Sequence, residues 1–183
     1  MNLEAMIRGD TRRGSVQIHR ASNGWGFRLE ASQFLPQPRE QVFEFFSDAF
    51  QLQTLTPPWL HFSVLTPAPI LMATGALIDY QLRVHGIPMH WQSCIREWEP
   101  PLRFVDLQTR GPYRHWSHQH IFEAADGGTL CRDVVDYAVY GGSIIHALFV
   151  RRDLLSIFAF RQGKLRYLLP AGALASPIRL EEP

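Results

Sequence analysis

The sequence predicts a single α+β domain in which an antiparallel sheet precedes one long C-terminal helix. Three observations support this fold class. Apolar and polar residues alternate along the middle of the chain, short turns separate the alternating segments, and helical spacing dominates near the end. The 183 residues suffice for one domain with a sizeable core.

The N-terminal part is expected to contain one strand and two short helices. Residues 1–24 are interpreted as an extension, in which residues 16–18 could form a short strand. Alternation from Phe27 to Gln33 predicts the first strand of the domain. Pro38 suits the first position of a helix, because proline has no N–H to leave unpaired there. A second short helix is expected over residues 49–55.

The middle of the chain predicts an antiparallel meander. Turns rich in glycine and proline separate the segments, which favours hairpins between consecutive strands. Together with the first strand, the six segments give a sheet of about seven strands. They are residues 59–65, 76–84, 89–98, 103–110, 113–123 and 129–139.

One long helix is expected after this sheet, with Ser143 as its N-cap and Pro170 beyond its end. Its basic side chains are interpreted as a solvated face, and residues 170–183 as a C-terminal tail. These boundaries leave residues 25–169 as the domain. The apolar face of the long helix is predicted to contain Ile145, Leu148, Phe149, Leu155, Phe158, Leu165 and Leu169.

Composition excludes several classes of function. The net charge of +1 does not resemble the basic footprint of a nucleic-acid-binding protein, so no nucleic-acid partner is expected. No apolar run reaches the roughly 18 residues of a membrane span, and no secretory signal is visible at the start. With only Cys94 and Cys131, no disulfide framework is possible, and a cytoplasmic location is the simplest expectation.

A polar cluster is predicted inside the sheet. Trp116, His118, His120 and Phe122 alternate along one strand, so they share one face. Asp106 and Gln108 lie on the preceding strand, and the turn at residues 111–112 pairs that strand with the strand of the two histidines. Asp133 lies on the following strand. We therefore expect a carboxylate close to the two imidazoles.

Three interpretations of this cluster remain open. It could be a self-satisfied hydrogen-bond network, an anchor for a ligand head group, or an acid/base pair for catalysis, with His118, His120 and Asp106 as candidates. The His-x-His spacing also resembles a metal site in which Asp106 or Asp133 supplies a third ligand. No Cys-x-x-Cys accompanies it, and neither a metal nor another cofactor is expected.

Several motifs resemble the START-like superfamily, also called SRPBCC or birch-pollen-allergen-like, which has a helix-grip fold. The resemblance covers about residues 26–169 and is strongest to bacterial polyketide cyclase/dehydrase-like proteins. It implies a curved antiparallel sheet around the C-terminal helix, with a large cavity between them. The motifs are PREQVFEFFSD (38–48), LQTLTPPW (52–59), WEPPLRF (98–104), Gly111-Pro112-Tyr113 and Gly127-Gly128-Thr129.

This resemblance implies a hydrophobic small-molecule ligand, such as a lipid, an isoprenoid quinone or a polyketide-like aromatic compound. The alternatives are a cyclase or dehydratase that uses a cavity histidine as acid/base, and a protein-interaction or regulatory domain. The residues expected to line the binding site are Ile78, Tyr80, Leu82, Trp91, Ile95, Asp106, Gln108, Trp116, His118, His120, Phe122, Asp133, Phe149, Leu155 and Phe158.

Overall fold

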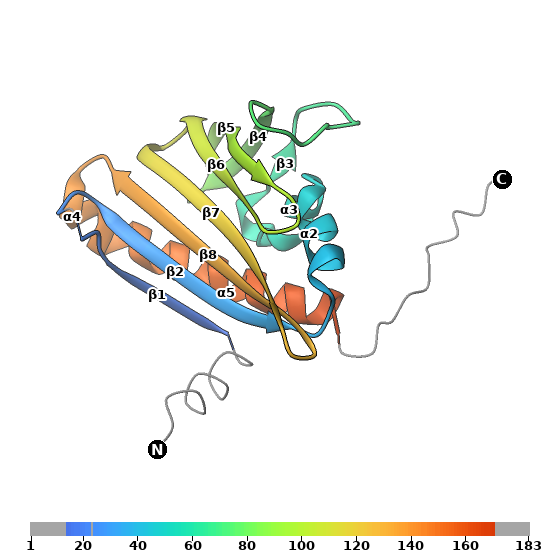
Figure 1. Ribbon diagram of the computed structural model, residues 1–183. Helices are drawn as coiled ribbons and strands as arrows, with labels where there is room; N and C mark the ends of the chain where they lie inside the picture. The colour runs from blue at the N-terminus through green and yellow to red at the C-terminus, as the bar shows by residue number, and fades with distance from the viewer. Residues whose placement is uncertain (1–13, 23, 171–183) are drawn as a thin grey trace, which may run out of the picture.

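The computed structural model describes residues 14–22 and 24–170. Within them, eight strands form one antiparallel sheet in the order β1-β2-β8-β7-β6-β5-β4-β3. Figure 1 shows this sheet bending around the long helix α5 (Arg151–Leu168). The strands are β1 (Ser15–Arg20), β2 (Phe27–Leu35), β3 (Ser63–Val64), β4 (Leu77–Val84), β5 (Ile87–Glu99), β6 (Arg103–Arg110), β7 (Tyr113–Ala125) and β8 (Gly128–Val139).

The helices form two groups. Between β2 and β3 lie α2 (Arg39–Ser47), α3 (Gln51–Leu55) and the 3-10 turn η1 (Pro58–Leu60). After β8 the chain forms α4 (Gly142–Ile145), the π-helical turn η2 (His146–Val150) and then α5. The helix-grip fold class is therefore confirmed. No helix among the described residues is both long and apolar enough to cross a membrane.

The strand inventory differs from the prediction at both ends of the sheet. β1, within the segment interpreted as an extension, pairs with β2 along its whole length. Conversely, the strand predicted over residues 59–65 shrinks to Ser63–Val64. The preceding residues form η1, because Pro58 begins its first turn and His61 ends it in the left-handed region, at φ 43°. The sheet therefore has eight strands rather than about seven.

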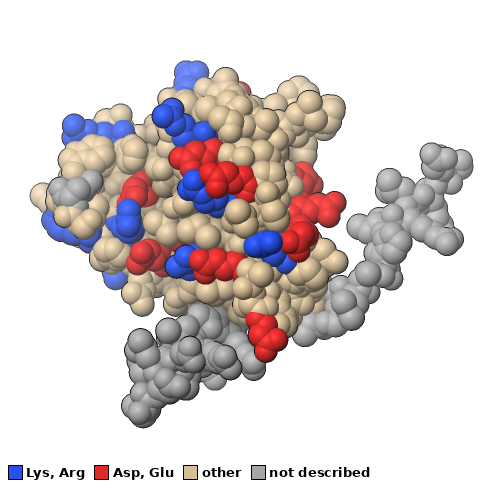
Figure 2. All heavy atoms as spheres, in the orientation of Figure 1, with Lys and Arg blue, Asp and Glu red and all other residues tan. Residues whose placement is uncertain are grey.

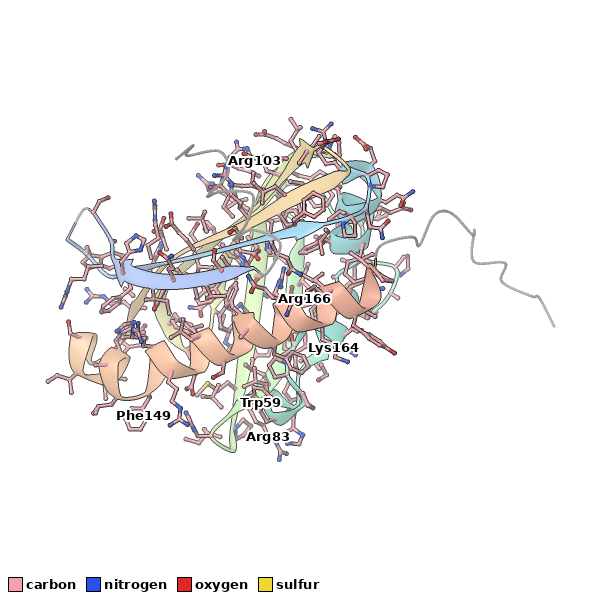
Figure 3. All side chains as sticks on the ribbon, turned by 90° about the horizontal axis from the view of Figure 1, so that it is seen from below. Trp59, Arg83, Arg103, Phe149, Lys164 and Arg166 are labelled. Carbon is pink, nitrogen blue, oxygen red and sulfur yellow. The ribbon has the colours of Figure 1, made fainter. Side chains whose placement is uncertain are left out.

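The C-terminal helical segment differs in its internal geometry. The expected uninterrupted helix contains the π-turn η2, which closes i→i+5 hydrogen bonds. The wider turn changes the angular position of later side chains relative to earlier ones. Phe149 is 50% exposed and points away from the sheet (Figure 3), and Leu148 is 63% exposed. The predicted apolar face is therefore wrong at Leu148 and Phe149.

His146 anchors the start of this helical segment. Its ring stacks on Phe27 with centroids 3.4 Å apart, and its Nε2 lies 2.9 Å from the Tyr137 hydroxyl. Burial lowers the pKa of His146, and the positive charges of Arg151 and Arg20 lower it further. The imidazole is consequently held in its neutral form at neutral pH.

The outward face of the sheet is solvated and mixed in charge, as Figure 2 shows. Arg28 on β2 donates two hydrogen bonds, of 2.7 and 2.6 Å, to the Asp136 carboxylate opposite it on β8. Arg132 on β8 contacts Glu123 on β7 at 2.6 Å. Such exposed pairs contribute at most about 1 kcal/mol each, so the fold depends on its inner face.

Two apolar clusters pack on that inner face. One surrounds α2 at one end of α5, and the other lies against β2 and β8 near the start of α5. The first includes Val42, Phe43, Phe46, Phe104, Phe122 and Leu165; the second includes Leu29, Trp116, Val135, Tyr137, Leu154 and Phe158.

Candidate functional site

A cavity of about 620 Å³ lies between the inner face of the sheet and α5. This volume is within the range of about 300–1,000 Å³ typical of small-molecule sites. Alternate residues of the strands in the middle of the sheet face it, because successive side chains of a strand point to opposite sides. The strands contribute Ile78, Tyr80, Leu82, Trp91, Ser93, Ile95, Phe104, Asp106, Trp116, His118 and His120, among others.

Helices close the other sides of the cavity. On α5 the lining residues Leu154, Ile157, Phe158 and Arg161 follow helical spacing. Phe46 of α2 and residues of α3 complete the wall. The lining is therefore mostly aliphatic and aromatic.

The cavity reaches the molecular surface. Three large hydrophobic residues of its lining are well exposed: Trp59 by 55%, Tyr140 by 64% and Ile145 by 39%. A ligand can thus approach between exposed apolar side chains.

The structure places ten of the predicted site residues on the cavity wall. The rings of Trp91, Trp116 and Phe158 are part of this wall, and space remains between them. His118 and His120 are buried on the inner face rather than directed to solvent. The ten are Ile78, Tyr80, Leu82, Trp91, Ile95, Asp106, Trp116, His118, His120 and Phe158.

Three predicted residues on the strands lie off the cavity wall. Gln108 turns to its own hairpin, where Nε2 donates to the Tyr113 carbonyl at 2.7 Å and Oε1 accepts from the Tyr113 N–H at 3.2 Å. Phe122 packs in the α2 cluster, with its ring 5.0 Å from that of Phe46. Asp133 contacts the two cavity histidines but does not line the cavity itself.

Two predicted residues on the helical segment also lie off the wall. Phe149 is on the π-turn and exposed, and Leu155 is half-buried beside the lining residue Leu154. The π-turn does not account for Leu155, which lies beyond it on the same regular helix as Phe158, about 100° around the helix from Leu154.

The polar residues of the cavity form one compact cluster. β-Pairing places Asp106 opposite His118 and Asp133 opposite His120. Asp133 Oδ1 lies 2.9 Å from both His118 Nε2 and His120 Nδ1. Asp106 Oδ2 lies 3.3 Å from His120 Nε2 and 3.8 Å from His118 Nδ1. Each imidazole is thus held between two carboxylates, as the predicted strand pairing implies.

Side chains further from the histidines hold Asp106 in place. The Ser93 hydroxyl donates to Asp106 Oδ1 at 3.3 Å, and the Trp91 indole N–H donates to the Ser93 oxygen at 3.1 Å. These contacts leave Asp106 Oδ2 for the histidines.

Arg161 belongs to this cluster but was expected on the solvated face of the helix. It is only 7% exposed, with Nη2 at 3.7 Å from Asp133 Oδ1 and 3.4 Å from His120 Nδ1. Its guanidinium also lies over the Phe46 ring, 5.1 Å from the centroid. Arg161 follows Phe158 by three residues and precedes Leu165 by four, so it lies on the same side of the helix as these two buried residues. This spacing was the sequence signal for its burial.

Burial and pairing move the pKa values of the cluster in opposite directions. Burial would raise the pKa of Asp133, but the Arg161 charge and the hydrogen bonds from both histidines hold it well below its usual value. Burial and the neighbouring His120 lower the pKa of His118. For His120, the hydrogen bonds to Asp106 and Asp133 outweigh burial and raise the pKa.

The cluster can therefore hold charge of both signs at one end of an apolar cavity. It offers imidazole nitrogens, carboxylate oxygens and a guanidinium to a bound molecule. Such a set can orient a polar group, exchange a proton with it, or coordinate an ion.

Comparison with known proteins relates this fold and cavity to others. The family model described as "Polyketide cyclase / dehydrase and lipid transport" matches residues 35–153. A search of curated proteins gave no match.

Several solved structures share the fold. Protein Ms6760 from Mycobacterium smegmatis superposes with a TM-score of 0.66 at 16% identity, covering 86% of this chain and 98% of that chain. The ZhuI aromatase/cyclase from Streptomyces sp. R1128 gives 0.57 at 15%, covering 85% and 99%. Ginseng major latex-like protein 151 from Panax ginseng gives 0.59 at 9%, covering 78% and 96%.

At these identities the structural similarities establish the fold alone. The family match extends over more than half of the chain, from the last residue of β2 through β8 and into the first residues of α5. On this evidence, the chain belongs to the polyketide cyclase/dehydrase and lipid transport family.

Proposed function

We propose that this protein binds a hydrophobic small molecule, such as a lipid, an isoprenoid quinone or a polyketide-like aromatic compound. The apolar body of the ligand lies in the cavity, and its oxygen-bearing head group meets the polar cluster. The observation that carries the proposal is an apolar cavity with a buried His–Asp–Arg cluster in its wall. The family membership supports the same class of ligand.

Burial of apolar surface supplies the affinity in this proposal. A ligand that buries about 300 Å² of apolar surface gains about 7 kcal/mol at roughly 25 cal/mol per Å². Association entropy and the ordering of flexible groups reduce this gain. The cavity wall is already formed by strand side chains, so little protein ordering is required.

Arg161 indicates which head groups the site favours. It lines the cavity, and its guanidinium is a cationic group of the polar cluster. A carbonyl, carboxylate or hydroxyl oxygen can accept a charge-assisted hydrogen bond from a guanidinium, whereas an entirely apolar ligand cannot.

Native mass spectrometry of protein purified without detergent tests the proposal first. A discrete co-purifying hydrophobic mass would support it, and the released molecule identifies the ligand class. Binding is then measured by fluorescence with the aromatic probe 1-anilinonaphthalene-8-sulfonate.

Two tryptophan substitutions on neighbouring positions of α5 make the test specific to the cavity. Ile157→Trp places a large ring in the cavity wall, whereas Ser156→Trp places the same ring on the exposed side of the helix. We expect Ile157→Trp to weaken probe binding at least tenfold and Ser156→Trp to leave it unchanged. Equal binding by both variants would place the probe outside the cavity and contradict the proposal.

A cyclase or dehydratase is the second candidate function. It is favoured by two cavity imidazoles whose pKa values are displaced in opposite directions, which is the arrangement that separates an acid from a base. In this case His118→Gln would retain probe binding and lose turnover of an enolisable ligand identified by mass spectrometry. A protein-interaction domain is less favoured, because it does not need an internal cavity.

A cytoplasmic location agrees with the two cysteines, Cys94 and Cys131, both of which are free.

A further inference from the structure

Three atoms that can each donate a lone pair converge at the polar end of the cavity. One ligand atom each of Asp106, His118 and His120 lies within 4.8 Å of the other two. Asp106 Oδ2 is 3.8 Å from His118 Nδ1 and 3.3 Å from His120 Nε2. All three residues line the cavity. The protonation of the two imidazoles decides whether the lone pairs are free.

Asp133 fixes the protonation of His118 and lies on the opposite side of both rings. Its Oδ1 lies 2.9 Å from His118 Nε2 and 2.9 Å from His120 Nδ1, and an ionised carboxylate can only accept hydrogen bonds. His118 Nε2, which hydrogen-bonds this oxygen, therefore carries hydrogen, and in the neutral ring its Nδ1 keeps a free lone pair. His120 Nδ1 also lies 3.4 Å from Arg161 Nη2, which can only donate.

The other two ring nitrogens face Asp106. A proton shared by His120 Nε2 and Asp106 Oδ2, 3.3 Å apart, joins two of the three atoms. His118 Nδ1, at 3.8 Å from Asp106 Oδ2, stays beyond hydrogen-bond distance of it. A cation bound by all three atoms would take the place of that proton and would also use the lone pair of His118 Nδ1.

We infer that Asp106, His118 and His120 bind one divalent transition-metal ion, such as Zn²⁺ or Fe²⁺, at the polar end of the cavity. Two imidazoles and one carboxylate are ligands that such ions use. With metal–nitrogen distances of about 2.0–2.1 Å, tetrahedral ligand atoms are about 3.3 Å apart, so small rotations of the rings complete the site.

The surroundings of the three ligands match those of known metal sites. Metal-binding histidines commonly donate their other ring N–H to a carboxylate, and here Asp133 Oδ1 hydrogen-bonds His118 Nε2 and lies 2.9 Å from His120 Nδ1. Ser93 holds the other oxygen of Asp106 at 3.3 Å. The described residues contain no fourth ligand in this group. A site with three protein ligands keeps a position for water or a ligand oxygen, and here that position adjoins the cavity.

Metal titration tests this inference without any hydrophobic ligand, so it does not depend on the proposed function. EDTA-treated protein is titrated with Zn²⁺ by calorimetry and with Co²⁺ by visible absorption. We expect one ion per chain and a Co²⁺ spectrum of four- or five-coordinate geometry. Protein that binds no ion saturably in either titration would overturn the inference.

Substitutions assign the ion to these residues. Asp106→Asn and His118→Gln are each expected to weaken Zn²⁺ binding at least 100-fold. Asp133→Asn, which does not touch the ion, is expected to weaken it by about 10–100-fold. The matched control is His90→Gln, which removes an exposed imidazole paired with Asp79 outside the cavity. This control should bind as the wild type does.

Each outcome decides the assignment. Circular dichroism and thermal unfolding show whether a variant is folded, and Zn²⁺ should raise the midpoint of the wild type but not that of Asp106→Asn. Binding that persists in Asp106→Asn and His118→Gln places the ion elsewhere and refutes the site. Unchanged affinity in Asp133→Asn refutes the hydrogen-bond argument on which the site rests. The wild-type titration is decisive even if a histidine variant does not fold.

Discussion

Replacing Arg161 by methionine would remove the positive charge from the polar cluster with little change in helix propensity. Arg161 and Asp133 are almost buried, with side chains 8% and 14% exposed, and their nearest atoms are 3.7 Å apart. The substitution leaves the Asp133 carboxylate with the two imidazoles as its partners. It tests whether the buried charges of the cluster depend on one another.

The expected loss of stability follows from the distance and the burial. At an effective dielectric constant of about 20, unit charges 3.7 Å apart attract by about 4.5 kcal/mol. The cation–π contact with Phe46 adds about 1 kcal/mol. Relief of the cost of burying the guanidinium offsets part of this, and breaking a buried pair typically costs about 3–5 kcal/mol. We expect Arg161→Met to lower the free energy of unfolding by about 3 kcal/mol.

Urea unfolding at neutral pH, followed by both circular dichroism and tryptophan fluorescence, measures this change. Coincident transitions justify the use of a single free energy of unfolding. The matched control is Arg152→Met, because Arg152 is exposed on the same helix and its loss should change stability by less than about 0.5 kcal/mol. An Arg161→Met protein as stable as this control would refute the coupling between Arg161 and the carboxylates.

The remaining predictions concern pH, backbone geometry and thiol access. The folded-state pKa of His146 lies below its unfolded value, so its stabilising contribution is lost as the pH falls below about 6.5. His146→Phe should therefore flatten the decline in urea midpoint between about pH 7 and pH 5. Equal slopes of urea midpoint against pH in the wild type and the variant would contradict this. Gly26→Ala should cost more than the roughly 1–2 kcal/mol of Gly24→Ala. Both glycines have positive φ, but only at Gly26 would a Cβ collide with backbone. Equal urea midpoints for the two variants would show that this collision does not occur. Burial raises the pKa of the Cys131 thiol, so iodoacetamide should alkylate half-buried Cys94 faster than Cys131 in the native protein. Mass spectrometry measures the two rates, and comparable rates would show that the Cys131 site opens.

The strand side of the site was predictable because a regular strand has a strict period of two. Along β7 the ladder with β8 is unbroken from His115 onward, so Trp116, His118 and His120 share the inner face as their spacing predicts. On β6, Asp106 faces the cavity. Gln108, two residues later, was predicted to do the same, but at the hairpin end its amide bonds the backbone of Tyr113. Alternation predicts the face of a residue but not competition from a neighbouring turn.

The helix side of the site was less predictable. A helical face depends on the accumulated angle along the chain, so the π-turn at residues 146–150 displaces every residue before it relative to those after it. No feature of composition distinguishes this turn from an α-helical one. Phe158 lines the cavity, whereas Phe149 and Leu155 do not. Nine residues of a regular α-helix rotate by about 900°, so Phe149 would lie opposite Phe158 even without the π-turn, and Leu155 lies beyond that turn.

Arg161 shows why the polar end of the cavity needs a functional explanation. Replacing a buried ion pair with apolar side chains of similar volume is often neutral or stabilising. The surroundings are already suited to such residues, since Phe104 stacks on His120 with centroids 4.2 Å apart and Phe46 lies beneath the Arg161 guanidinium. The fold alone therefore does not require a guanidinium, two imidazoles and two carboxylates in this position. Their desolvation is a cost that a bound head group or ion would offset, because an oxygen can accept hydrogen bonds from the donors of the cluster and a cation can use its carboxylate and imidazole lone pairs.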